Sequence, residues 1–377
     1  MDPSPFLGLP SAVALESAAD AGVPSHYGNP LAEQRRLDEG LALVDLSTRP
    51  VFELRGEDRL TWINSITSAD LLALTPGDSG ETLFLDPQGR IEHAVPLIED
   101  GVSLWLLPEA SSAPALWAWL LKMRFRSRVE ILDRTADYAR IGVMERADAP
   151  LFSSLNAVAP HGVPLIWRDP WAAVVPGGWQ YAAADSAGGH PGDGFAWREV
   201  LLERSGLGAL AAAHPVAGSL AAEALRIAAW RPRESTEVDD KSIPHESDWL
   251  RTAVHLNKGC YRGQETVAKV HNLGHPPRRL VMLNLDGSEG FLPDPGSEVR
   301  AFRNDEPRIV GAITSSALHY ELGPIALALI RRAVDPTIDL SVAQDEGWIA
   351  AGQEVIVPSD AGSVADIPKL PRLGARR

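Results

Sequence analysis

The stretch Lys258-Gly259-Cys260-Tyr261-Arg262-Gly263-Gln264-Glu265 holds the one cysteine of the chain and is its most informative segment. Two glycines bracket the cysteine and permit backbone conformations that other residues would strain. Lys258 and Arg262 place positive charge within two residues of the sulfur, a setting typical of reactive thiols. The alternative is an inert buried cysteine, which is common for free thiols. We favour a working thiol at Cys260.

The composition is that of a globular protein, with 377 residues of which 45% are hydrophobic and 23% charged. The length predicts roughly two to three domains. A net charge of −15 argues against broad nucleic-acid binding, which needs a basic face. A single cysteine excludes an intrachain disulfide and a cluster held by four cysteines of this chain. Neither a signal peptide nor a membrane span is recognisable, so we predict a cytoplasmic protein without a membrane partner.

Local patterns predict several elements. Strands are expected at 81–85 and 91–98, because Asp86-Pro87-Gln88-Gly89 between them has strong turn chemistry. Residues 197–203 and 220–230 have helical periodicity. Beyond Pro277, short strands recur between Gly and Pro turns, a spacing typical of a small β-barrel or sandwich.

The motif Lys-Gly-Cys-Tyr-x-Gly-Gln-Glu at 258–265 resembles the hallmark of the YgfZ family of folate-binding proteins. That family includes a mitochondrial iron–sulfur assembly factor, and it is related to the glycine-cleavage T protein, an aminomethyltransferase. Other segments are also similar to the family, so the resemblance covers about 41–357. These segments are 84–90, 224–227, 243–246 and 308–315.

The resemblance implies an α+β fold. The expected architecture is a three-lobed ring with a folate-binding, aminomethyltransferase-like core, a ferredoxin-like lobe and a C-terminal β-barrel. Tetrahydrofolate or a derivative would lie in the central hole. The expected divisions are a helical N-terminal extension at 1–40, the folate-binding region at 41–275 with its ferredoxin-like lobe at about 100–200, the barrel at 276–357, and a disordered Pro-rich tail at 358–377.

The resemblance also implies two groups of site residues. The thiol of Cys260 would be the reactive group, supported by Lys258, Arg262, Gln264 and Glu265. Folate would be bound by Glu92, His93, Arg168, Trp179, Gln180, Arg226 and Tyr261.

A zinc site is the alternative use of Cys260. His271 and His275 have a spacing that suits zinc on a helix. Gly274 and the prolines that follow predict a loop there instead, so we assign no metal or cluster to this chain alone.

Two positions depart from the aminomethyltransferases. Glu92-His93 stands where the transferases carry two acidic residues, one of them an aspartate that acts on folate. A glutamate is one carbon longer and a histidine is not a permanent anion, so transfer by the glycine-cleavage route is not expected. Gln180 takes the place of a glutamate that grips the pteridine, and it offers one donor and one acceptor group. Folate binding weaker than in the enzymes is therefore implied.

Three functions stay open at this point. The first is a folate-dependent accessory protein for the assembly or repair of iron–sulfur enzymes, including tRNA-modifying ones, with folate, those enzymes and assembly proteins as partners. The second is a folate-dependent one-carbon transferase. The third is a folate-gated binding module without chemistry. The change at Glu92-His93 favours the first and third, and the thiol flanked by cations favours the first.

Overall fold

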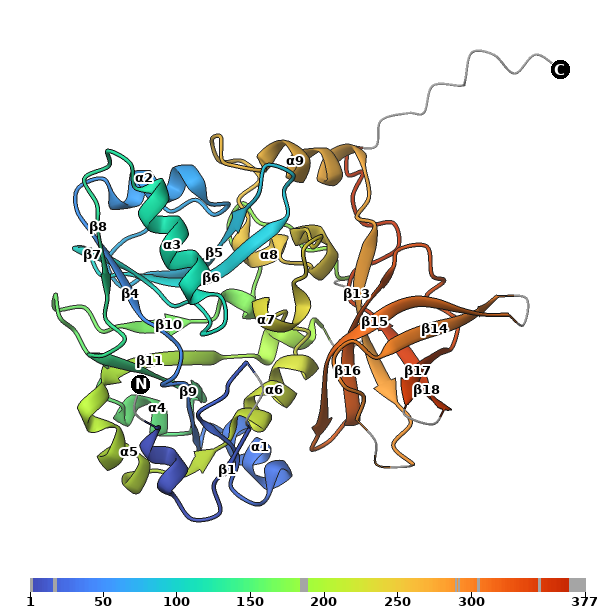
Figure 1. Cartoon of the computed structure of the whole chain (residues 1–377), viewed down its shortest axis with the longest axis horizontal. Helices are drawn as coiled ribbons and strands as arrows, with labels where there is room; N and C mark the ends of the chain where they lie inside the picture. The colour runs from blue at the N-terminus through green and yellow to red at the C-terminus, as the bar shows by residue number, and fades with distance from the viewer. Residues whose placement is uncertain are drawn as a thin grey trace.

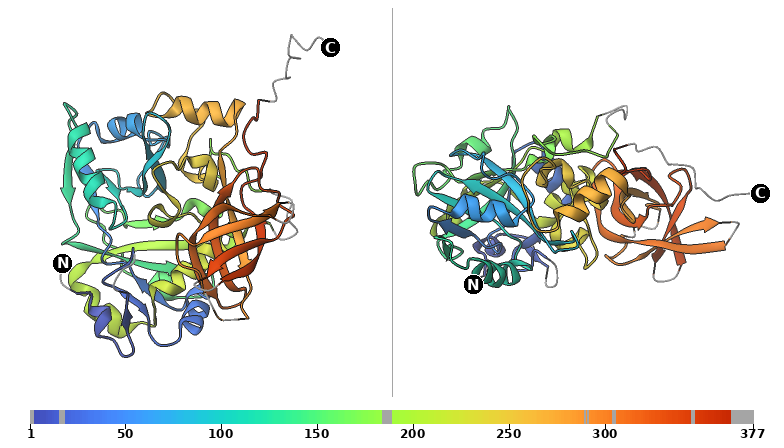
Figure 2. Two further views of the ribbon diagram at one scale, coloured as in Figure 1. Left: turned by 45° about the vertical axis from the view of Figure 1, so that its right-hand side comes forward. Right: turned by 90° about the horizontal axis from the view of Figure 1, so that it is seen from above.

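The computed structural model describes residues 3–15, 19–183, 189–288, 290, 292–303, 306–344 and 347–365. Two five-stranded sheets and a closed six-stranded barrel form three lobes (Figure 1). The view from above shows the barrel beside the two sheet lobes (Figure 2). The α+β fold with a C-terminal barrel is as expected. Residues 366–377 of the predicted disordered tail lie outside the described residues.

The first lobe is built on a sheet of order β10-β11-β9-β3-β12, in which only β12 and β3 pair in parallel among the described strands. Its strands are β3 (Leu43–Asp45), β9 (Tyr138–Met144), β10 (Ile166–Arg168), β11 (Trp197–Glu203) and β12 (Val216–Ala217). The segments around it are η1 (Pro5–Gly8), β1 (Val13–Ala14), β2 (Pro24–His26), α1 (Pro30–Asp38), α4 (Leu151–Ser154), η2 (Pro170–Ala172), η3 (Pro191–Gly194), η4 (Arg204–Gly206), α5 (Leu207–Ala213) and α6 (Ser219–Ala228). Residues 1–40, expected to be helical, thus contain the short β1–β2 pair as well as α1.

The helix predicted at 197–203 is wrong, because this segment is the strand β11. It pairs with β9 along its whole length and with β10 on its other side. Seven residues are too few for periodicity to separate a helix from a strand. The hydrogen bonds offered by two neighbouring strands decide the conformation, and tertiary context commonly overrides local preference in this way.

The second lobe is a sheet of order β5-β6-β7-β4-β8. Its strands are β4 (Phe52–Arg55), β5 (Ser79–Leu85), β6 (Ile91–Glu99), β7 (Ser103–Leu106) and β8 (Glu130–Asp133), with helices α2 (Arg59–Ile66) and α3 (Ala113–Met123). The predicted hairpin is present as β5 and β6, paired from Ser79↔Ile98 to Leu85↔Ile91. The expected ferredoxin-like lobe at about 100–200 draws strands from both sheets, so the domain boundaries stay a prediction.

The barrel closes in the order β13-β16-β15-β14-β17-β18, with antiparallel pairing throughout the described ladders. Its strands are β13 (Arg278–Leu285), β14 (Glu298–Arg303), β15 (Glu306–His319), β16 (Gly323–Arg331), β17 (Leu340–Gln344) and β18 (Gly347–Val355). Between the sheets and the barrel lie α7 (Glu234–Glu237), η5 (Pro244–Ser247), α8 (Leu250–Ala253) and α9 (Gln264–Leu273).

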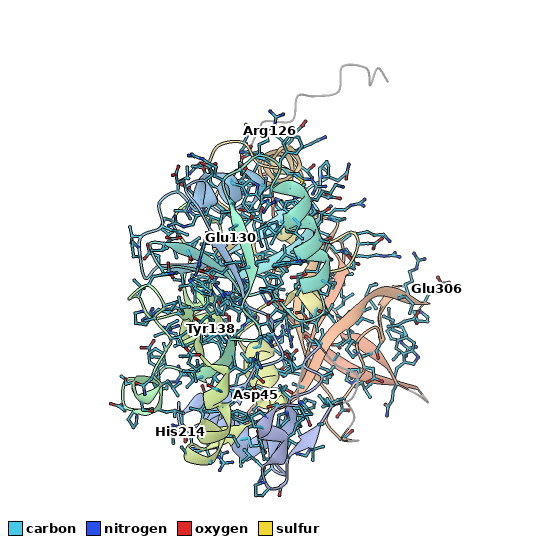
Figure 3. All side chains as sticks on the ribbon, turned by 60° about the vertical axis from the view of Figure 1, so that its left-hand side comes forward. Asp45, Arg126, Glu130, Tyr138, His214 and Glu306 are labelled. Carbon is cyan, nitrogen blue, oxygen red and sulfur yellow. The ribbon has the colours of Figure 1, made fainter. Side chains whose placement is uncertain are left out.

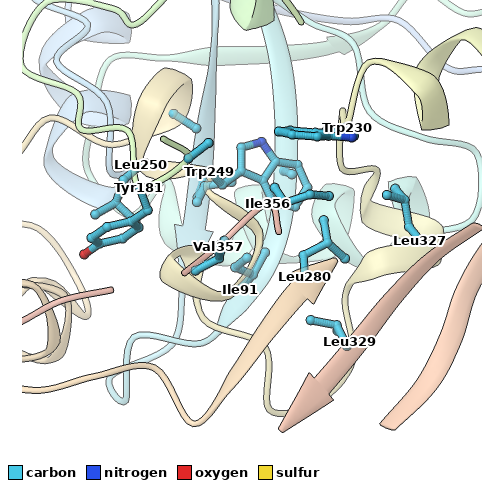
Figure 4. Packing of buried hydrophobic residues seen from close by; sticks show 14 of the residues in the cluster. Ile91, Tyr181, Trp230, Trp249, Leu250, Leu280, Leu327, Leu329, Ile356 and Val357 are labelled. Atoms are coloured by element: carbon cyan, nitrogen blue, oxygen red, sulfur yellow. The ribbon is translucent and has the colours of Figure 1, made fainter. Parts of the chain in front are cut away.

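Figure 3 draws the side chains on the ribbon, with labels on Asp45, Tyr138 and His214 of the first lobe, Arg126 and Glu130 of the second, and Glu306 of the barrel. The lobes meet in one hydrophobic cluster. Trp230 and Trp249 pack there with Ile91 of the second lobe and Leu280 and Leu327 of the barrel (Figure 4). The segment between α6 and α9 is therefore the common core of the ring.

Asp248 lies in this core and generates a testable prediction. It is 0% exposed and accepts the backbone N–H of Tyr181 and of Ala182. Burial raises the pKa of Asp248 from 3.8 to about 7. Between these values the folded state holds a proton that the unfolded state has released, so this residue makes stability fall as pH rises from 4 to 7. Each unit of pKa difference corresponds to about 1.4 kcal/mol.

We therefore expect Asp248→Asn to flatten the pH dependence of the free energy of unfolding over this range, measured by urea denaturation. Asp286→Asn, at an exposed position of the barrel, serves as the control and should leave the slope unchanged. An unaltered slope in Asp248→Asn would show that the buried carboxyl is already ionised at low pH.

Candidate functional site

The cysteine motif packs against the turn of the β5–β6 hairpin. Gly263 and Gly89 both have left-handed backbones, with φ of 82° and 78°. A Cβ at Gly263 would lie 2.6 Å from the carbonyl oxygen of Asp86, and one at Gly89 would lie 2.9 Å from Cβ of Thr266. Each glycine is therefore required for two reasons: its left-handed backbone and the close approach of the motif to the hairpin turn. Two segments that were recognised separately in the sequence form one site.

Lys258 anchors the motif to the second lobe. Its Nζ donates hydrogen bonds to the carbonyl oxygens of Asn64 and Thr67, at 2.8 Å each, and to that of Ala69. The carbonyls of Asn64 and Thr67 lie at the C-terminal end of α2, where a cation is favoured, and Ala69 follows in the next segment. Burial lowers the pKa of Lys258 to about 8. The ammonium is therefore committed to the end of α2.

Arg262 and Gln264 hold the motif in shape. Arg262 Nη1 lies 2.6 Å from Glu92 Oε2 on β6, and Gln264 Nε2 donates to the carbonyl of Lys258. Tyr261 is 8% exposed, with Lys258 Nζ 5.3 Å from its ring centroid. Glu265 is exposed in the first turn of α9, where a negative charge suits the helix dipole.

Cys260 is exposed, so the alternative of an inert buried cysteine is excluded. The charged groups of Lys258 and Arg262 are bound to the α2 segment and to Glu92, and neither has a described contact with the sulfur. An exposed thiol on a braced loop is open to a partner molecule at the surface. The motif is therefore suited to reaction with, or docking of, another protein.

A separate cavity, which we call the central cavity, lies where the two sheets meet α6 and has a volume of about 100 Å³. Aromatic rings of Trp167, Phe195, Trp197 and Trp249 form part of its wall. Hairpin β5–β6 contributes Glu81, Ala94 and Pro96. No described residue of 258–265 and none of the barrel lines it. The hairpin therefore reaches from the cavity wall to the cysteine motif.

Ion pairs crowd the cavity. Arg231 pairs with Glu81 of the second lobe at 2.7 Å and with Asp169 of the first at 3.0 Å. Burial raises the pKa of Asp169 to about 6, against the opposing pull of Arg231. Arg233 pairs with Asp20 at 2.7 Å and with Glu109 at 3.0 Å. Breaking such buried pairs is costly because the remaining charge keeps no partner.

The residues predicted to bind folate fall into three groups. Arg226 lines the cavity, and His93 reaches it indirectly, with Nδ1 3.3 Å from the cavity residue Glu234. Tyr261 belongs to the cysteine motif, and Glu92 on β6 contacts the motif through Arg262. The remaining three lie elsewhere: Arg168 is exposed, Trp179 packs edge-on against His271, and Gln180 Nε2 donates to the carbonyl of Ala182.

Sequence reasoning missed most of the charged cavity residues. Glu199 was missed because 197–203 was read with a helical period. In a strand, Trp197 and Glu199 share one face and both reach the cavity. Arg231-Pro232-Arg233 directly after an apolar helix was a usable signal. Its partners Glu81, Asp169 and Asp20 are distant in sequence, so no local pattern could pair them.

Nearly the full length of the chain superposes on a solved structure. The glycine cleavage system aminomethyltransferase T from Bartonella henselae matches 96% of this chain and 95% of its own, with a TM-score of 0.72 and 17% identity. The fold is that of an aminomethyltransferase. At this identity the likeness establishes the fold and not the activity.

Curated relatives divide between two roles. A chloroplast protein of Arabidopsis thaliana, whose name proposes a transferase, is 27% identical over 79% of this chain. A mitochondrial protein of Mycosarcoma maydis, named an iron–sulfur cluster assembly factor IBA57 homologue, is 26% identical over 64%. An aminomethyltransferase of Symbiobacterium thermophilum is 25% identical over 70%. The chain spans 66% of the Arabidopsis relative and 57% of the Mycosarcoma one. No family model matches.

Two negative findings apply to the described residues alone. They contain no group of three His, Cys, Asp or Glu side chains placed to hold a metal ion. None of their helices combines the length and apolarity needed to cross a bilayer.

The packing of the motif against the hairpin can be tested with a pair of glycine substitutions. Gly263→Ala forces a side chain into a left-handed residue, which costs about 1–2 kcal/mol, and adds the clash with Asp86. Gly259→Ala is the matched control, because its Cβ meets nothing within 4 Å. We expect urea denaturation to show a loss above about 1 kcal/mol for Gly263→Ala and within about 0.5 kcal/mol for Gly259→Ala. Equal stabilities would contradict the close approach.

Proposed function

We propose that this protein is a cytoplasmic, tetrahydrofolate-binding accessory factor for the assembly or repair of iron–sulfur enzymes, including tRNA-modifying ones. One observation carries the proposal: the β5–β6 hairpin lines the central cavity at its base and braces the cysteine motif at its turn. A ligand in the cavity and a partner at Cys260 would then act on the same element. The sequence relation to an iron–sulfur assembly factor supports the direction of this proposal.

The side chains of the cavity fit the chemistry of a reduced folate. Aromatic faces at Trp167 and Trp197 suit a flat pterin, and carboxylates such as Glu199 suit its paired N–H donors. Arginines such as Arg226 suit the carboxylates of its tail. Tetrahydrofolate, when bound, would supply one-carbon chemistry.

The volume sets a condition on this binding. A cavity of about 100 Å³ is smaller than the roughly 300–1,000 Å³ of most small-molecule pockets. Folate would therefore have to displace side chains that now pair with each other. Opening these ion pairs costs free energy, which agrees with binding weaker than in the enzymes.

The residues of the cysteine motif would form the contact with the partner protein. Cys260 would present its thiol, while Lys258 and Arg262, through α2 and Glu92, would fix the loop that carries it. Gln264 would close the loop and Glu265 would offer an exposed carboxylate for docking. In this proposal no resident metal is required.

The one-carbon transferase is the second candidate, favoured by the fold and by the aminomethyltransferases among the relatives. The contacts of Glu92 and His93 weigh against it. Glu92 is engaged by Arg262, and the His93 ring faces Glu234, so neither stands as a free acid in the cavity. Tetrahydrofolate-dependent release of ammonia from an aminomethylated lipoyl carrier protein would favour the transferase.

Folate binding can be tested by filling the cavity. Ala222 of α6 lines it, whereas Leu220 of the same helix is exposed. We expect calorimetry to give a tetrahydrofolate Kd in the micromolar range or weaker, near −8 kcal/mol. Ala222→Phe should weaken binding more than about tenfold because it occupies the site, and Leu220→Phe should not. If both variants bind as the wild type does, folate lies elsewhere or is not a ligand.

The thiol can be tested in cells. We expect a deletion strain to lose activity of iron–sulfur enzymes, most under oxidants, while glycine cleavage stays intact. Cys260→Ser should fold normally, since the side chain is exposed and nearly isosteric, yet fail to complement. Full complementation by Cys260→Ser would favour the binding module without chemistry. Unchanged iron–sulfur enzyme activities in the deletion strain would refute the accessory role itself.

A further inference from the structure

Three buried side chains near Trp171 offer hydrogen-bond donors that no described residue accepts. These are Nε2 of His190, Nε1 of Trp230, and both Nε and Nη1 of Arg251. Their residues are 6%, 7% and 1% exposed. Buried donors are almost always satisfied, and a buried charge almost always has a partner. We call these three residues the donor cluster.

Trp171 brings the donor cluster together. Its ring centroid lies 5.9 Å from the His190 ring and 4.8 Å from Cζ of Arg251. Its Nε1 donates to the carbonyl of Ala229, the residue before Trp230, and the Trp230 ring lies 5.4 Å from that of His190. Three segments far apart in sequence thus converge on one fully buried indole.

The cluster can only donate. His190 Nδ1 accepts the backbone N–H of Gly192, so the neutral ring carries its proton on Nε2. Burial lowers the pKa of His190 to about 4, which keeps the ring neutral near pH 7. The indole of Trp230 has no acceptor atom and the guanidinium of Arg251 has none either. The complement of such a site is a group made of acceptors.

Arg251 differs from the other arginine on the same indole. Arg231, with Cζ 5.2 Å from the Trp171 ring, is neutralised by Glu81 and Asp169. Arg251 has no described carboxylate within ion-pair distance and donates only to the carbonyl of Trp171. Asp248, Asp193 and Asp169 act on it from further away. Burial leaves Asp248, the first of these, with a raised pKa of about 7, so its negative charge is only partial near neutral pH.

The backbone at Trp230 forms the end of helix α6: the N–H of Trp230 donates to the carbonyl of Ile227 and the N–H of Arg231 donates to that of Arg226. The φ of Trp230 is 59°, in the left-handed region that bulky residues rarely adopt. A left-handed residue after the C-cap is a common way for a helix to end, and here that residue is a tryptophan in place of the usual glycine. The Trp230 ring packs edge-on against the His190 ring. It also belongs to the hydrophobic cluster drawn in Figure 4.

We propose that the donor cluster is a binding site for an oxyanion, the carboxylate or phosphate group of a small ligand. The guanidinium of Arg251 supplies the charge, and the N–H groups of His190 and Trp230 complete the set of donors. The site lies outside the central cavity, because none of the three residues lines it. The proposal does not depend on folate binding.

The test is calorimetric titration of the whole protein with inorganic phosphate and, separately, with acetate, at constant ionic strength in chloride. We expect one of the two to bind saturably, and the tighter one identifies the chemistry of the natural group. Arg251→Met should abolish that binding. Trp230→Phe keeps a ring and removes only the N–H, so it should weaken binding by roughly tenfold.

Arg279 provides the matched control. It is 0% exposed and also leaves Nε and Nη1 unpaired, while its Nη2 donates to the carbonyl of Val334 and to Gln353 Oε1, so it belongs to the barrel and not to the donor cluster. Arg279→Met should leave the titration unchanged. If Arg251→Met fails to fold, Trp230→Phe decides alone. Absence of saturable binding in the wild type, or equal loss in the Arg279 variant, overturns the proposal and leaves the donors to ordered water.

Discussion

The ion pair between Arg231 and Glu81 is the contact on which the arrangement of the two sheets depends. Arg231 follows α6, Glu81 belongs to β5, and Asp169 comes from the first lobe, so one guanidinium joins three separate parts of the chain. Glu81 is held in turn by Nε1 of Trp249 and by the hydroxyl of Thr252. Removing either charge would leave the other buried without a partner, which costs several kcal/mol.

This pair also sets the position of the hairpin. Glu81 is held near the start of β5, and β5 pairs with β6 up to the turn at 86–89. The ion pair and the strand pairing together therefore fix the position of this turn. The left-handed glycines then let the cysteine motif approach the turn directly. The β5–β6 hairpin consequently connects the cavity to the cysteine motif, although no described residue of the motif lines the cavity.

The charged side chains of the cavity form ion pairs between segments that are far apart in the sequence. In the cavity, Arg231 and Arg233 each pair with carboxylates from separate segments, and the partners of Arg233 include Asp20 of the N-terminal region. Burial works to raise the pKa of Asp20, but Arg49 and Arg233 together hold it well below its usual range. The net contribution of such pairs to stability is small, since desolvation offsets most of the attraction between the charges. Arg226 connects the cavity to the barrel, because its Nη2 donates a hydrogen bond to the hydroxyl of Ser315 on β15.

The sequence by itself determined the cysteine motif, the β5–β6 hairpin and the barrel, because each depends on local chemistry: glycines, turn residues and short strands with regular spacing. The resemblance also predicted a folate-binding role for Arg226, which lines the cavity; the role itself stays a prediction. Only the tertiary structure decided that 197–203 is a strand, since two neighbouring strands supply its hydrogen bonds. The same holds for the partners of Lys258, Arg231 and Arg251. Whether a charge is paired depends on residues distant in the chain, and no local pattern encodes that distance.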